Sequence, residues 1–396
     1  MKLMGWTTPT DLRDQMQRYW DSGRLLATPL KGESLFPLEL RLRGPDNRAL
    51  SERFEDVRLW IHELESESRY QIEWVEINHR LLGRNRVPAR ILVTNERDAF
   101  DLIGKIDDAE RFRSLGAFTL EKLPQLGSWL TRKPLVALEY YADWERILAV
   151  LAWFIGHPRC GLYLRQLDIT GVDTKFIETR KGLLAELLDH VLPPEALDTS
   201  GPWPKNFEQR YGLASKPPQI RFRILDRRLS IQGLTDLAVT AREFASLKLP
   251  VEHVFITENE INGLAFPNLP GSLVIFGLGY GLERLSEVRW LQERTIQYWG
   301  DIDTYGFHIL DQLRSRFPDT RSFLMDRDTL LEHLPLCVLE SDPYNGELPR
   351  LTAAEEGLYN DLRYDRFGDR IRLEQERIPY GWVERALTLL LNLSGK

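Results

Sequence analysis

Val251-Glu-His-Val-Phe-Ile-Thr-Glu-Asn-Glu-Ile-Asn-Gly263 and Ile296-Gln-Tyr-Trp-Gly-Asp-Ile-Asp-Thr-Tyr-Gly306 share one pattern, a short apolar run that ends in acidic residues. Further apolar runs lie at Leu273–Phe276 and Phe323–Met325, and the segments between the runs are long enough for helices. Short apolar strands that alternate with helices are typical of a parallel sheet with crossover helices. We therefore predict an α/β domain with a parallel sheet over residues 248–396.

The acidic residues that end two of these runs form a candidate metal site. Open parallel sheets place their sites beyond the carboxyl ends of the strands. Asp301 and Asp303 are two positions apart, so in extended chain their side chains point to one side, where Glu258 on a neighbouring strand can face them. A cation relieves the repulsion among three carboxylates, and oxygen ligands of this kind suit Mg²⁺ or Mn²⁺. Glu260 is a further candidate ligand, although a carboxylate that starts a helix has the same pattern.

This arrangement predicts metal-dependent hydrolysis of a phosphodiester. We expect Asp301 and Asp303 to hold the metal, and Glu258 to be a third ligand or the general base. An alternative remains open for Asp303, because acidic residues at strand ends also cap the helices that follow them.

The composition is that of an ordinary globular protein. The chain has 396 residues, of which 43% are hydrophobic and 28% charged, so two or three domains are expected. The longest apolar stretch, Ile147–Ile155, is too short to cross a membrane. Cys160 and Cys337 are the only cysteines and have no metal-site spacing, so neither a disulfide framework nor a zinc site is expected. We therefore expect a cytoplasmic protein without a membrane segment.

Proline-rich breaks divide the chain into three predicted domains. They lie at Pro124–Pro134, at Pro193–Pro204 and before Pro250. The first domain, residues 1–135, combines an N-terminal helix with strand-like alternation, so we predict an α+β fold. The second, residues 136–247, contains the amphipathic segments Trp144–Ile155 and Lys181–Val191, which favour a helical or winged-helix module. The third is the α/β domain of residues 248–396.

Two segments carry candidate DNA-binding cations. The formal net charge is −7, yet the segment Lys205–Arg228 has seven cations and two anions, with aromatic residues between them. Its candidates are Lys216, Arg221 and Arg223. Lys175, within the polar segment Gly171–Glu178, is another. A solvated strand edge or a partner-facing surface explains the basic segment equally well, and turns and caps explain the polar one.

Several motifs together resemble a known family. The strand that ends in Glu258, the turn Gly277-Leu-Gly-Tyr280 and Asp301-x-Asp303-x-x-Gly306 resemble the Toprim domain of the type IIB topoisomerase A subunits. The resemblance extends over nearly the whole chain to the JetD family, also called MksG, which are the nuclease subunits of Wadjet systems. The segments that carry it are Gly171-Val-Asp-Thr-Lys-Phe-Ile-Glu178, Lys216-Pro-Pro and Arg372-Leu-Glu-Gln-Glu376.

The resemblance implies both an architecture and an activity. The architecture is an N-terminal arm domain, a winged-helix domain related to catabolite-activator proteins, and a C-terminal Toprim domain. The activity is that of a homodimeric, Mg²⁺-dependent endonuclease that cuts circular plasmid DNA. In that family the nuclease works with an SMC-kleisin-type, MukBEF-like complex, named JetABC or MksBEF, in defence against plasmids.

The chain departs from the topoisomerase pattern at two positions, which keeps other functions open. Leu278 stands where the usual Gly-Lys-Gly turn has its cation, and the nucleophilic tyrosine has no clear counterpart, Tyr163 being the nearest candidate. One alternative function is a transesterase that links a tyrosine such as Tyr163 to DNA. The other is a non-catalytic DNA-binding subunit of an SMC complex, in which the carboxylates bind no metal.

Overall fold

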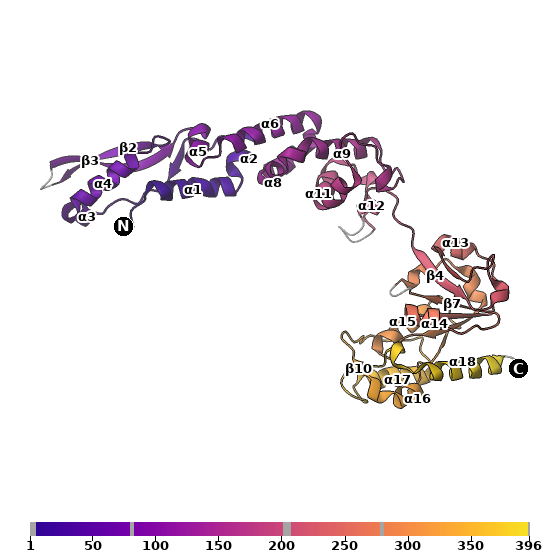
Figure 1. Ribbon diagram of the computed structural model, residues 1–396. Helices are drawn as coiled ribbons and strands as arrows, with labels where there is room; N and C mark the ends of the chain where they lie inside the picture. Colours follow the sequence, from indigo (N-terminus) through magenta and orange to yellow (C-terminus); the bar gives the residue numbers. More distant parts are fainter. Residues whose placement is uncertain (1–4, 80–82, 201–206, 278–280, 395–396) are drawn as a thin grey trace. The chain divides into compact units, whose positions relative to one another are not determined.

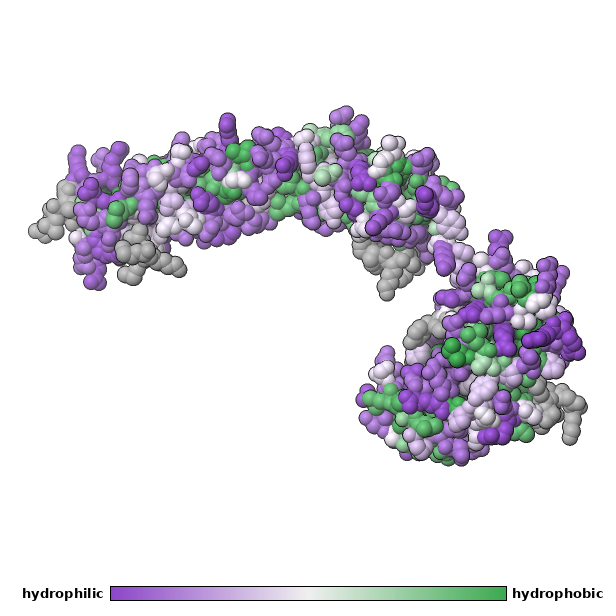
Figure 2. All heavy atoms as spheres, in the orientation of Figure 1, coloured by the Kyte–Doolittle hydropathy of each residue, from purple (hydrophilic) through white to green (hydrophobic). Residues whose placement is uncertain are grey.

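The computed structural model describes residues 5–79, 83–200, 207–277 and 281–394 (Figure 1). The chain divides into two units, Met1–Ser215 and Lys216–Lys396, each with its own apolar core. Hydrophilic residues cover most of the visible surface of both units (Figure 2). In the described residues no helix is long and apolar enough to span a bilayer.

The first part of unit 1 is a small α+β assembly, as predicted. Thr8 caps helix α1 (Pro9–Asp21) in a capping box with Asp11, and the helix buries Leu12, Met16 and Trp20 at a spacing of four residues. An antiparallel sheet follows, in the order β1-β3-β2. Its strands are β1 (Leu38–Leu40), β2 (Gln71–His79) and β3 (Gly83–Val93). The helices around it are α2 (Arg24–Leu30), α3 (Asn47–Glu52), α4 (Phe54–Glu65) and α5 (Glu96–Leu102).

The second part of unit 1 is mainly helical. The helices are α6 (Ile106–Lys122), α7 (Gly127–Arg132), α8 (Pro134–Glu139), α9 (Trp144–Gly156), α10 (Thr174–Thr179), α11 (Lys181–Val191) and α12 (Phe207–Arg210). Both amphipathic segments predicted from the sequence are confirmed as α9 and α11. Trp144 packs α9 against α7 and α6, because its ring stacks on Trp129 at 5.8 Å and its indole N–H donates to Thr119 Oγ1 at 2.7 Å.

Unit 2 is built on a six-stranded sheet in the order β5-β4-β7-β6-β8-β9. The strands are β4 (Gln219–Ile224), β5 (Asp236–Thr240), β6 (His253–Thr257), β7 (Ser272–Phe276), β8 (Thr295–Trp299) and β9 (Arg321–Ser322). The pairs β7-β6, β6-β8 and β8-β9 are parallel, and almost every residue of β6, β7 and β8 is buried. The predicted parallel sheet is therefore confirmed, except that its fourth strand is β9 and the apolar run Phe323–Met325, predicted as that strand, begins directly after it.

Helices and a small ribbon complete unit 2. The helices are α13 (Ala241–Ser246), α14 (Glu260–Ala265), α15 (Thr304–Arg314), α16 (Arg327–Glu332), α17 (Ala353–Arg363) and α18 (Tyr380–Ser394). The short strands β10 (Val338–Leu339) and β11 (Ile371–Arg372) pair antiparallel. A buried ion pair joins α15 to α17, with Arg314 Nη1 and Nη2 at 2.6 and 2.9 Å from the Glu355 carboxylate.

The boundary between the units differs from the predicted one at residue 247. Strands β4 and β5 lie before that residue, yet β4 pairs antiparallel with β7 and with β5, which makes both part of the C-terminal sheet. The basic strand β4 therefore belongs to the unit that carries the acidic residues.

Candidate functional site

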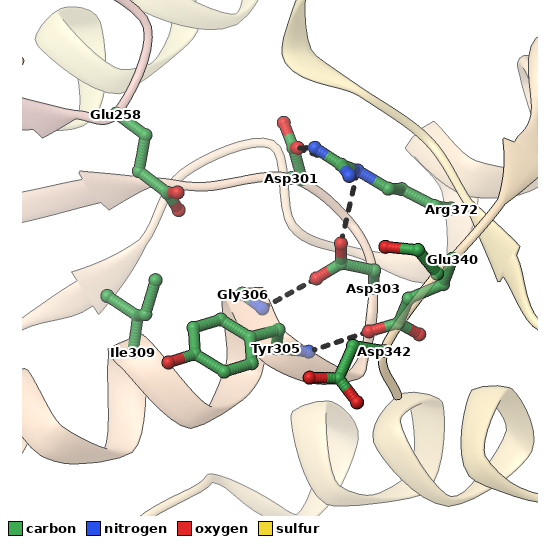
Figure 3. Close-up of a pocket in the computed structure, with 10 residues that line it drawn as sticks. Glu258, Asp301, Asp303, Tyr305, Gly306, Ile309, Glu340, Asp342 and Arg372 are labelled. Carbon is green, nitrogen blue, oxygen red and sulfur yellow. Dashed lines mark hydrogen bonds and ion pairs between the residues drawn. The ribbon is translucent and has the colours of Figure 1, made fainter. Parts of the chain in front are cut away.

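The ends of two neighbouring parallel strands bring the predicted carboxylates together. Thr257, the last residue of β6, lies opposite Trp299, the last residue of β8. Glu258 and Asp301 therefore leave the sheet at the same edge. Both line a cavity of about 180 Å³ together with Asp303 (Figure 3). The grouping expected from strand-end spacing is thus present in the structure.

The Asp-x-Asp-x-x-Gly spacing has a steric cause. Asp303 caps α15, and its Oδ1 accepts from the Gly306 backbone N–H at 2.6 Å. A Cβ on Gly306 would lie 2.2 Å from the backbone oxygen of Asp301, so only glycine fits this turn. The helix-cap interpretation of Asp303 is therefore confirmed, and the same side chain also faces the cavity.

Two carboxylates that the sequence analysis missed line the same cavity, Glu340 and Asp342. Glu340 follows β10 and is 3% exposed. It accepts from Thr304 Oγ1 at 2.7 Å and from the Tyr305 backbone N–H at 3.2 Å, at the start of α15. A signal was available, because Val338-Leu-Glu-Ser-Asp342 repeats the pattern of an apolar run followed by acid-x-acid.

Arg372, on β11, makes direct ion pairs with two of the carboxylates (Figure 3). Its Nη2 and Nε lie 2.5 and 3.0 Å from Asp301 Oδ2, and its Nε lies 3.3 Å from Asp303 Oδ2. Two backbone hydrogen bonds between Ile302 and Leu373, of 2.9 and 3.1 Å, hold the two segments together. The Arg372–Glu376 motif is therefore part of the site.

Gln375, 2% exposed, ties the strand ends to this motif. Its Oε1 accepts from Thr257 Oγ1 at 2.6 Å and from Asn262 Nδ2 at 3.1 Å. Its Nε2 donates to the Trp299 backbone oxygen at 2.9 Å, and its own backbone N–H donates to Asp301 Oδ1 at 2.9 Å. One buried amide side chain thus fixes the ends of β6 and β8 relative to each other.

Burial raises the pKa of two of the carboxylates that line the cavity, Glu258 and Asp303. Burial raises the pKa of Glu258; a hydrogen bond from the Tyr298 hydroxyl opposes this increase, and the charge of Asp301 adds to it. Burial also raises the pKa of Asp303 to about 7, and the charge of Glu340 contributes. Burial is the main cause of both shifts, and the charge of Arg372 opposes both.

The donor chemistry of this cavity fits a hard divalent cation. Five carboxylates line it, and their oxygens are the ligands that Mg²⁺ and Mn²⁺ prefer. Within the described ranges, no three acidic, histidine or cysteine side chains are already placed to hold an ion. Arg372 contacts both aspartates, so the guanidinium and a metal would share the same oxygens.

Three of the other predicted site residues are engaged elsewhere in unit 2. Glu260 is the first residue of α14, does not line the cavity and forms an ion pair with Arg221. Arg221 also pairs with Asp236, at 2.9 Å. Arg223 donates to the backbone oxygen of Leu264. The structure therefore does not bring Glu260 to the acidic trio, and it holds both arginines of β4 in contacts within the unit.

The remaining candidates lie on the surface or outside the described ranges. Lys175 on α10 and Lys216 before β4 are exposed, and neither has an ion-pair partner among the residues that the structure describes. Tyr163 is in unit 1, and 47% of its surface is exposed. Of the predicted Gly277–Tyr280 turn, residues 278–280 lie outside the described residues.

Comparison with known families gives two matches that cover most of the chain. Residues 212–387 match the family model described as Wadjet protein JetD, C-terminal. Residues 9–189 match a model described as the N-terminal part of an uncharacterized protein conserved in bacteria, DUF3322. No curated protein matches the chain. The C-terminal match includes every residue named above as lining the cavity.

Proposed function

The chain belongs to the JetD family of Wadjet proteins, and on this premise we propose that it is the metal-dependent DNA endonuclease of a Wadjet-type defence system. The observation that carries the proposal is the cavity at the strand ends, where five carboxylates meet one guanidinium. Asp303 and Glu340 are buried, Glu258 and Asp301 are half-buried, and like charges this close together are costly without a cation, so the cluster supports a metal-dependent role.

Asp301 and Asp303 would hold Mg²⁺ or Mn²⁺, and Glu258 would be a third ligand or the general base. When bound, such an ion polarises a phosphate oxygen and lowers the pKa of a bound water. Glu258 is held by the Tyr298 hydroxyl, and its raised pKa makes it a stronger base than an ordinary carboxylate. With Glu258 as the general base, a water oxygen bonds to phosphorus as its proton passes to Glu258, and the bond to the 3′ oxygen breaks while that oxygen takes up a proton from solvent.

The finer assignments belong to the same proposal. Unit 2 would be a Toprim domain, and the helical part of unit 1 from residue 136 would act as a winged-helix module. The substrate would be double-stranded circular plasmid DNA, contacted through exposed cations such as Lys175 and Lys216. A homodimer would work with a MukBEF-like SMC-kleisin complex, because an ungated nuclease would endanger the cell's own DNA.

The test is cleavage of a circular plasmid by the full chain in Mg²⁺ and in Mn²⁺, with and without the SMC-type complex. We expect Glu258→Gln and Asp301→Asn to remove cleavage. Glu260→Gln is the matched control, because this exposed carboxylate does not line the cavity and should cut as well as wild type.

Three results would contradict the proposal. Undiminished cutting by Glu258→Gln and Asp301→Asn would move the chemistry away from this cavity. Cut ends that carry covalently attached protein would indicate a transesterase that uses a tyrosine such as Tyr163, whereas no cutting under any condition would favour a non-catalytic subunit.

A further inference from the structure

Arg372 is the one positive charge among the described residues that line the acidic cavity. Its side chain is 33% exposed, so the guanidinium is in reach of a ligand from solvent. Strand β11 holds its backbone, since Arg372 pairs with Val338 of β10. The site therefore contains a cation that the fold itself places against the proposed metal ligands.

The hydrogen bonds of the two aspartates show what Arg372 occupies. Backbone N–H groups take one oxygen of each carboxylate: Gln375 N donates to Asp301 Oδ1 at 2.9 Å, and Gly306 N donates to Asp303 Oδ1 at 2.6 Å. Arg372 takes the other oxygen of each, with contacts of 2.5 Å to Asp301 Oδ2 and 3.3 Å to Asp303 Oδ2. The guanidinium therefore contacts the one oxygen of each aspartate that does not accept from a backbone amide.

Resting on the proposed function, we propose that Arg372 neutralises Asp301 and Asp303 in the metal-free site. When the metal binds these aspartates, the guanidinium moves away from them and binds a phosphate of the DNA. A guanidinium and a divalent ion repel each other at the same oxygens, so metal binding requires the guanidinium to withdraw. The planar guanidinium fork suits phosphate oxygens as well as carboxylates. DNA and metal then favour each other's binding, and by linkage the effect is reciprocal.

This exchange predicts opposite effects of one substitution on metal binding and on cleavage. Without DNA, Arg372→Gln should bind Mn²⁺ at least about tenfold more tightly than wild type, because a unit charge a few ångströms from the ion is removed. The same variant should cleave DNA more slowly, since the phosphate contact is lost. A purely structural arginine would weaken both properties together.

The experiment measures Mn²⁺ binding to the DNA-free full chain by electron paramagnetic resonance, alongside the melting temperature with and without Mn²⁺. Arg377→Gln is the matched control, because Arg377 pairs with Glu374 at 2.9 Å and does not line the cavity. For Arg372→Gln we expect tighter Mn²⁺ binding and a larger increase in melting temperature on adding Mn²⁺ than for Arg377→Gln. If Arg372→Gln fails to fold, Arg372→Lys replaces it and should bind Mn²⁺ more tightly than wild type, because lysine lacks the planar fork that holds both aspartates.

Mn²⁺ binding by Glu258→Gln separates this proposal from the proposed function. Loss of binding in Glu258→Gln, with unchanged or weaker binding in the Arg372 variants, would overturn the role of Arg372 and leave the metal site in place. Unchanged binding in Glu258→Gln and in Asp301→Asn would overturn the metal site, and the Arg372 proposal with it.

Discussion

Replacing Gly306 by alanine tests whether the close turn between Asp301 and α15 sets both stability and activity. The added Cβ would lie 2.2 Å from the Asp301 backbone oxygen, so the two groups must separate by roughly 1 Å to reach ordinary contact. Overpacking of this kind costs about 1–3 kcal/mol, and loss of the Asp303 cap adds about 1 kcal/mol. Alanine's better helix propensity offsets about 1 kcal/mol, so the net destabilisation should be about 1–3 kcal/mol.

The assay is hydrogen exchange of peptides from residues 295–315 at increasing urea, which reports on unit 2 separately from unit 1. Gly357→Ala in α17 is the control, because its Cβ meets nothing within 4 Å, and it should be neutral or stabilising by up to about 1 kcal/mol. Plasmid cleavage by Gly306→Ala should decrease by about 100-fold, since displacements of this size misalign reacting groups. Wild-type stability together with wild-type cleavage would refute the steric account of this turn.

Three further predictions follow from single groups. Tyr163→Phe should cleave plasmid DNA at the wild-type rate with protein-free ends, and loss of cleavage would restore the transesterase hypothesis. Burial on its own raises the pKa of Glu355. Hydrogen bonds, of which that from Arg314 has the largest effect, nevertheless hold this pKa at about 2, below its ordinary value of 4.5. The stabilisation from this ionised carboxylate, roughly 2–3 kcal/mol, is therefore present above about pH 4.5 and lost as the pH falls toward 2, so Glu355→Gln should show a weaker loss of unfolding free energy over that range. Lys175→Ala and Lys216→Ala should each weaken DNA binding and reduce its salt slope by about one in fluorescence anisotropy, whereas substituting the paired arginines of β4 should have smaller effects.

The parallel part of the sheet was predictable because each strand carries its own signal. Strands β6, β7 and β8 are buried on both faces and read as continuous apolar runs. Strand β4 alternates buried and partly exposed residues, a pattern that identifies a half-buried strand but not its partner. Its pairing with β7, some 50 residues away, depends on tertiary packing, and for this reason the domain boundary was predicted too late in the chain.

Some residues of the site were likewise predictable from the local sequence, whereas others are placed by contacts between distant segments. Glu258, Asp301 and Asp303 follow strongly apolar strands, so the parallel sheet alone predicts their meeting. Glu340 follows a strand of only two residues, too short to stand out in the sequence. Arg372 reaches Asp301 from 71 residues away, and alternating charges in its motif are equally typical of a solvated surface.

The carboxylates of the cavity have hydrogen-bond donors within the protein, so a bound metal should affect catalysis and folding to different degrees. Glu258 has the Tyr298 hydroxyl, Asp303 has the Gly306 amide, and Glu340 has the start of α15, so each buried acid has a hydrogen-bond donor without any ion. Sites that fold only with metal lack such partners, because there the ion supplies the missing interactions. The carboxylates of this cavity already accept hydrogen bonds from the protein, and Arg372 partly neutralises them. A bound ion therefore replaces existing contacts, and the fold does not depend on it. Metal binding should therefore control the chemistry of unit 2 far more than its stability.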